Sequence, residues 1–119
     1  MKNLIPGLPM LLLLGACATD PALGEHERKL LWIEQANPQA DAREALSRND
    51  FRLVGLTPRT LVIPGVDSAQ TRNYELKCGV RLIDGVTDVV RSQEHLRLMK
   101  LAHTYALQYN SLVKLRCQP

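Results

Sequence analysis

The stretch that decides the fold is QEHLRLMKLAHTYALQYNSLVKL, residues 93–115, because its pattern predicts one long amphipathic helix. Its apolar side chains recur at spacings of three and four, which places them on one helical face: Leu98, Leu101, Ala102, Tyr105, Tyr109 and Leu112. The opposite side is polar: Arg97, Lys100, Thr104, Gln108, Ser111 and Lys114. Ser92 stands directly before the helix and suits an N-cap. A membrane or a partner could take up the apolar stripe, but we expect it to cover a β-sheet.

The stretch NYELKCGVRLIDG, residues 73–85, predicts the central strand of that sheet. Five apolar residues alternate with polar residues or glycine, as in a strand with one buried face: Tyr74, Leu76, Cys78, Val80 and Leu82. The runs FRLVGL (51–56) and RTLVIPGV (59–66) predict two more strands, which could form a hairpin across Thr57-Pro58. Residues 67–72 are polar and predict a loop.

Two short helices are predicted before the strands. Residues 25–36, EHERKLLWIEQA, begin with acidic side chains, which suit a helix N-terminus, and Asn37-Pro38 should end this helix. Asp41 and Glu44 have the spacing of a capping box for the second helix, with Ala42, Ala45 and Leu46 facing inward. The expected fold is a small single α+β domain, residues 25–119. In it the long C-terminal helix covers about three mainly antiparallel strands.

The N-terminus predicts an export signal. Lys2 is the only early charge, and the apolar run Leu4–Leu14 contains two prolines. This run is about half the length of roughly 20 residues that a membrane-spanning helix needs. A positively charged start, a short apolar segment and small residues before a cleavage point are typical of a secretory signal peptide.

The residues Leu14-Gly15-Ala16-Cys17 resemble the lipobox of bacterial lipoproteins. The resemblance implies that signal peptidase II removes residues 1–16, that Cys17 carries acyl chains such as palmitate, and that residues 17–24 form a lipidated tether. Ala18 stands where lipoproteins kept at the inner membrane of enteric bacteria typically carry Asp. The implied location is therefore the outer membrane, facing the periplasm. The alternative is an ordinary signal peptide in which Cys17 occurs by chance.

Cys78 and Cys117 would lie in an oxidising compartment after export, where a disulfide between them is expected. A buried free thiol or a bond to another chain are the alternatives. The formal net charge is +3, and charges of both signs alternate along the chain without a basic block. This pattern predicts a solvated surface and gives little support to nucleic-acid binding.

Candidate chemical groups are few, and we expect no catalytic site, metal or cofactor. Asp84 and Asp88 flank a turn. Such aspartates more often form hydrogen bonds with the backbone of the turn than bind calcium. His95 and His103 lie on different sides of the final helix and are expected at its surface or rim. Trp32 is expected to fill the core. The serines lack the G-x-S-x-G context of a nucleophile.

The mature domain loosely resembles small uncharacterised lipoproteins of Gram-negative bacteria, through FRLVGL, VIPGV, GVTD with EH, and YALQYN. No activity follows from that resemblance. The expected function is that of a lipid-anchored accessory subunit of an envelope complex, with a protein partner and an apolar patch that includes Leu107 and Leu115. The alternative is a small ligand-binding or enzyme-inhibiting module with a cleft near residues 67–72 or Asp84–Asp88.

Overall fold

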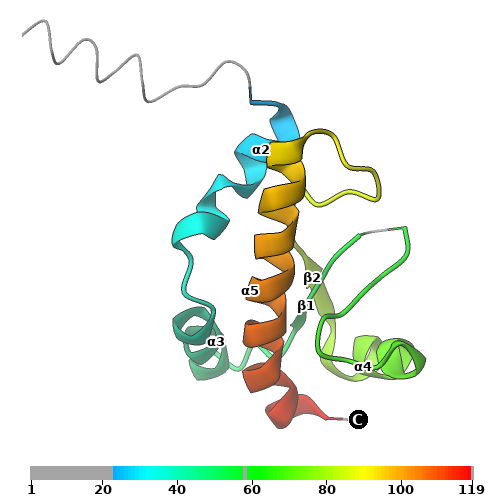
Figure 1. Ribbon diagram of the computed structural model, residues 1–119. Helices are drawn as coiled ribbons and strands as arrows, with labels where there is room; N and C mark the ends of the chain where they lie inside the picture. Colours follow the sequence, from blue (N-terminus) through cyan, green and yellow to red (C-terminus); the bar gives the residue numbers. More distant parts are fainter. Residues whose placement is uncertain (1–22, 58, 119) are drawn as a thin grey trace, which may run out of the picture.

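The computed structural model describes residues 23–57 and 59–118, and its central element is the long helix α5, Gln93–Cys117. Figure 1 shows the N-terminal helices along one side of α5, with the strands and α4 along the other. In chain order the elements are α2 (Glu25–Leu30), the 3₁₀ turn η1 (Leu31–Gln35), α3 (Pro38–Ser47), β1 (Leu53–Gly55), η2 (Ser68–Gln70), α4 (Thr71–Cys78), β2 (Val80–Leu82) and α5. Within the described ranges, none of the helices has the length and apolarity that crossing a bilayer requires.

The prediction of α5 is confirmed in position and in its cap, but its buried face is rotated. The Ser92 hydroxyl accepts a hydrogen bond from the His95 N–H at 3.0 Å, as an N-cap does. Leu101, predicted on the apolar stripe, is 37% exposed. The buried face instead extends in the other direction to include His95, Ala106, Asn110 and Val113. At about 100° of rotation per residue, the centre of the buried face lies roughly 60° around the helix axis from the centre of the predicted apolar stripe.

The two N-terminal helices are confirmed, with a correction to the start of the second. Residues 25–35 form α2 and η1, and Leu30 and Ile33 are buried. The second helix begins at Pro38, because Asn37 provides the cap through its side chain, which accepts from the Ala40 N–H at 3.0 Å. Asp41 is therefore not the cap; its carboxylate accepts from the Tyr105 hydroxyl at 2.6 Å.

The predicted central strand over 73–85 is wrong for its first half. Residues 71–78 form α4, and only Val80–Leu82 form a strand. The apolar residues Tyr74 and Cys78 are four apart, a spacing that fits one helical face as well as it fits alternation. Gly79 ends the helix with a positive φ of +79°, a backbone conformation that other residues rarely adopt, and β2 begins directly after it.

The sheet consists of two parallel strands rather than three mainly antiparallel ones. β1 pairs with β2 in the register Leu53↔Val80, Val54↔Arg81 and Gly55↔Leu82. Parallel neighbours need a crossover connection, and the segment that contains α4 provides it. The predicted loop over 67–72 is part of this crossover, since it forms η2 and the start of α4.

The third predicted strand, residues 59–66, is reduced to one antiparallel bridge, Leu56↔Val62. Next to this bridge, the outer edge of β1 is paired with a side chain instead of a strand. The Asn110 amide accepts from the Val54 N–H at 2.7 Å and donates to the Val54 C=O at 2.9 Å. It also donates to the Pro64 C=O at 2.9 Å. Asn110 is fully buried. Its side-chain amide makes the two hydrogen bonds to Val54 that a peptide group of a neighbouring strand would otherwise make.

The hydrophobic core lies between α5 and the elements on its two sides. It includes residues from every helix except η2 and from β1: Leu30, Ile33, Ala42, Ala45, Leu53, Val54, Leu56, Ile63, Cys78, Ile83, Val86, Leu98, Ala102, Tyr105, Ala106, Tyr109, Val113 and Cys117. The inward positions Ala42 and Ala45 of α3 are confirmed. This continuous core is the expected content of one small domain.

An ion pair within the turn before β1, between Asp50 and Arg52, makes stability depend on pH. Hydrogen bonds from the Arg52 guanidinium, at 3.0 Å to each Asp50 oxygen, lower the pKa of Asp50 from 3.8 to about 2. Because the pKa is lower in the folded state, the stabilisation is complete above pH 4. It is lost as the pH falls toward 2.

Asp50→Asn is therefore expected to destabilise the protein by about 1 kcal/mol at pH 7, a value already reduced for solvent screening. The difference from the unsubstituted protein should vanish near pH 2, which urea unfolding at a series of pH values will measure. Asp88→Asn, at an exposed carboxylate, is the matched control. A difference for Asp50→Asn that does not change with pH would contradict the prediction.

Candidate functional site

The predicted disulfide is present and joins the ends of two helices. Cys78 is the last residue of α4 and Cys117 the last of α5. Their Cα atoms are 5.5 Å apart, and both residues are buried. The bond therefore ties the crossover helix to the C-terminal end of α5. Cys17, the predicted lipidation site, lies outside the described residues.

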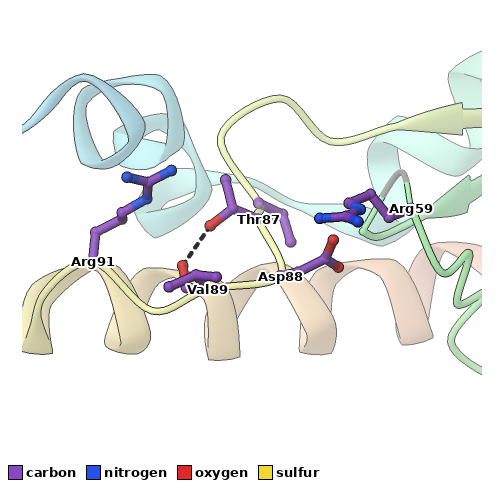
Figure 2. Close-up of a pocket in the computed structure, with 6 residues that line it drawn as sticks. Arg59, Thr87, Asp88, Val89 and Arg91 are labelled. Carbon is purple, nitrogen blue, oxygen red and sulfur yellow. Dashed lines mark hydrogen bonds between the residues drawn. The ribbon is translucent and has the colours of Figure 1, made fainter.

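The loop between β2 and α5 borders a hollow on the surface of the domain. This hollow has a volume of about 250 Å³ and is lined by residues of the loop together with one residue of the 59–66 segment: Arg59, Val86, Thr87, Asp88, Val89 and Arg91. Figure 2 shows the side chains of Arg59 and Asp88 pointing toward each other across it, while the Arg91 guanidinium points toward α2. The Thr87 hydroxyl donates to the Val89 C=O at 2.7 Å and shapes the tip of the loop.

The two candidate aspartates of this loop do not converge on a common site. Asp84 lies 3.8 Å from the Lys29 ammonium, whereas Asp88 lines the hollow. In residues 23–57 and 59–118, no group of three or more His, Cys, Asp or Glu side chains is arranged to hold a metal ion.

His95 is fully buried, so its expected place at the surface or rim is wrong. Its ring closes the loop by contacting both ends. Nδ1 accepts from the Arg91 backbone N–H at 3.1 Å, and Nε2 lies 2.9 Å from the Gly85 C=O. Since a backbone N–H can only donate, Nδ1 must be the acceptor, and the ring proton therefore belongs on Nε2. His103, the other histidine of α5, is exposed and lies eight residues after His95.

His95→Phe is expected to destabilise the protein by about 2 kcal/mol, because the ring volume is kept while two backbone groups lose their partners. Amide hydrogen exchange should accelerate across residues 86–91 more than in the rest of the chain. His103→Phe, the same substitution at an exposed position of α5, should change neither quantity. Unchanged exchange in the loop would show that His95 does not close it.

A buried carboxylate completes this cluster and was not anticipated from the sequence. Glu27 is 5% exposed and accepts from the Ser92 hydroxyl at 2.7 Å. This hydrogen bond is the main cause of a lowered Glu27 pKa. The cluster resembles a Ser-His-acid set only in composition, because the contact between Ser92 and His95 uses the His95 backbone N–H. Its chemical role is to cap α5 and attach α2, not to activate a nucleophile.

His26 lies beside this cluster without entering its hydrogen bonds. Its ring centroid is 5.7 Å from that of His95, and its buried Nδ1 has no hydrogen-bond partner among the described residues. Two imidazoles without a third ligand do not make a metal site.

The aromatic residues form a structural group rather than a binding platform. Trp32, which was expected in the core, is 44% exposed, and its ring meets the edge of Tyr105 at 5.2 Å between centroids. Tyr105 and Tyr109 are buried as predicted, and Arg81 lies 4.9 Å above the Tyr109 ring. Burial and the hydrogen bond to Asp41 raise the pKa of Tyr105.

Comparison with protein-family models, with curated protein sequences and with solved structures finds no match to this chain. Sequence reasoning missed Asn110, Glu27 and the burial of His95. Helical spacing could have revealed two of them. His95 lies three residues before the buried Leu98, and Asn110 directly follows the buried Tyr109.

Proposed function

We propose that this chain is a lipid-anchored protein of the bacterial cell envelope, with an interaction or structural role as an accessory subunit. The anchor is acylated Cys17, and the proposed location is the outer membrane with the domain facing the periplasm. The observation that carries the proposal is the Cys78–Cys117 disulfide, because such bonds persist in oxidising compartments outside the cytoplasm. It agrees with the destination that the lipobox-like residues imply for an exported chain.

The end of the domain that carries the disulfide offers apolar side chains to a partner. Leu76 is 70% exposed and Leu115 is 65% exposed, and each precedes its neighbouring cysteine by two residues. Leu107 is 43% exposed, although its side chain lies close to Gly65. Leu76 and Leu115 lie beside the two joined cysteines, so they can contribute to one exposed apolar patch, which is the kind of surface that a protein partner covers.

A ligand-binding module is the second candidate, and the hollow next to Asp88 favours it. A cleft in this region is what a binding module requires, and about 250 Å³ approaches the lower limit of common ligand pockets. A soluble ligand that binds there with the anchor removed would favour this candidate over the accessory subunit.

The anchor is tested by metabolic labelling with a palmitate analogue. The native chain should incorporate the label and fractionate with membranes, and Cys17→Ser should do neither, because its hydroxyl does not provide the thioether. Ala18→Ser, which adds a hydroxyl at the neighbouring residue and leaves the thiol in place, is the matched control. Label that persists in Cys17→Ser would overturn the lipidation of this residue.

The interaction role is tested by crosslinking in intact cells followed by mass spectrometry. We expect a distinct envelope protein to be crosslinked to the anchored chain and lost in Leu115→Asp. Leu96→Asp introduces the same charge near the other end of α5 and should retain it. Recovery of abundant outer-membrane proteins alone, equal in all variants, would count against a specific partner.

A further inference from the structure

The loop of residues 84–92 is attached to α2, the described helix nearest to Cys17. The Ser92 hydroxyl bonds Glu27, and Asp84 lies 3.8 Å from the Lys29 ammonium. Gly85, with φ +100°, packs so closely on α2 that a Cβ atom there would come within 2.9 Å of the His26 carbonyl oxygen. Figure 1 shows the loop and α2 together at one end of α5.

Covalent geometry limits how far this end can lie from an acylated Cys17. Six residue steps separate Cys17 from Leu23, so their Cα atoms are at most about 22 Å apart. The 25 residues of α5 extend over about 37 Å. An acylated Cys17 would therefore hold α2 and the loop within reach of the bilayer, whereas the disulfide end lies farther from the tether along α5.

The loop presents the chemistry of a membrane-contacting surface. Val89 and Val90 are 64% and 51% exposed at its tip, although they are apolar. Arg59 and Arg91 flank the hollow beside them. Neither arginine has a carboxylate oxygen within 4.0 Å in the described part of the chain.

The acidic groups of this end leave the arginines available. Glu25 and Asp84 both pair with Lys29, Glu94 pairs with Arg97, and Glu27 is buried against Ser92. Asp88 faces Arg59 across the hollow. An anion that binds Arg59 must therefore come close to the Asp88 carboxylate. The His95 ring contacts both ends of the loop, which ties them to the start of α5.

Resting on the lipid anchor proposed above, we propose that residues 86–91 are a second membrane contact, which binds an anionic phospholipid surface. Val89 and Val90 enter the head-group region, where apolar side chains gain favourable burial. Arg59 and Arg91 bind lipid phosphates on either side of the tip. The contact orients the domain on its tether and presents the disulfide end to the periplasm.

The test uses the acylated chain in vesicles, with an environment-sensitive fluorophore on Val90→Cys. The native cysteines are either acylated or in the disulfide, so the introduced thiol is the one that reacts. On vesicles of phosphatidylglycerol and phosphatidylethanolamine, we expect a blue shift and protection from an aqueous quencher. Leu76→Cys, a leucine of similar exposure at the disulfide end, is the matched control and should remain accessible.

The role of the arginines is tested with Arg91→Gln in the Val90→Cys background. Removing one cation should reduce the protected fraction relative to the unprotected fraction by about fivefold, equivalent to about 1 kcal/mol. Lys100→Gln, an exposed cation farther along α5, should leave it unchanged. Equal effects of the two substitutions would overturn the assignment to lipid phosphates.

Three outcomes separate this proposal from the others. Equal quenching at positions 90 and 76 on vesicle-bound protein would overturn the membrane contact while leaving the anchor intact. A response of the position-90 probe to inorganic phosphate without vesicles would also overturn it and would identify a soluble-anion site. Lack of acylation in the labelling experiment would overturn the anchor itself, and this proposal with it.

Discussion

Asn110→Ala is expected to lose about 4 kcal/mol of unfolding free energy, which is most of the stability of many domains of this size. The substitution leaves three groups without their side-chain partner: the N–H and C=O of Val54 and the C=O of Pro64. Each buried polar group that loses its partner costs about 1–3 kcal/mol. The better helix propensity of alanine returns only about 0.5 kcal/mol.

Urea unfolding followed by circular dichroism will measure this loss. Ser111→Ala, at the exposed neighbouring position of α5, is the control and should lie within about 0.5 kcal/mol of the native chain. A loss below about 1 kcal/mol for Asn110→Ala would mean that water or a rearranged backbone replaces the amide.

Asn110→Asp provides a sharper form of the same test. The introduced carboxylate keeps an acceptor for the Val54 N–H but faces the carbonyl oxygens of Val54 and Pro64, to which it cannot donate. Its protonated form can donate to one of them, so folding should raise the pKa of the introduced acid. Stability should therefore be greatest at low pH and fall as the pH rises through that pKa. Unfolding curves that do not depend on pH would contradict this interpretation.

Replacing both Cys78 and Cys117 by serine is expected to destabilise the protein by up to about 4 kcal/mol. The bond closes a loop with a sequence separation of 39 residues, and the chain-entropy estimate for such a loop gives this value. The effect acts mainly on the unfolded chain, which becomes free to explore more conformations. Locally, α4 should also loosen, because its end loses the link to α5.

The measurement compares unfolding free energies of the native chain and the double-serine variant, each with and without a thiol reductant. Reductant should lower the stability of the native chain toward that of the variant and leave the variant unchanged. Hydrogen exchange should accelerate in α4 more than in α3, which packs on α5 without a disulfide. An unchanged native chain after confirmed reduction would refute a stabilising role for the bond.

The helical part of the fold was predictable because its signals are local. The cap at Ser92 and the long run of spacings of three and four define α5 from its own residues. Likewise, Asn37-Pro38 separates the two N-terminal helices, although Asn37 itself is the cap that was assigned to Asp41. The pairing of Cys78 with Cys117 followed from their number, together with the expectation that the chain is exported.

The candidate site was predictable only in part, because its contacts join residues that are distant in sequence. The loop near Asp88 was identified as the place for a cleft, and the hollow lies there. The partners of His95 and Glu27 depend on how α2 packs against the start of α5, which no local pattern encodes. A buried histidine and an exposed one have the same appearance in an amphipathic sequence.

The sequence by itself determined the long helix and the two helices before it, since each depends on neighbours within a few turns of chain. It also determined the cysteine pair, because only two cysteines remain once Cys17 is set aside, although they are 39 residues apart. Only the tertiary structure decided that residues 71–78 are helical, that β1 and β2 are parallel, and that the Asn110 amide replaces a third strand. The physical reason is that short apolar runs satisfy both periodicities. The choice between helix and strand then falls to the partners that bury them and satisfy their backbone groups.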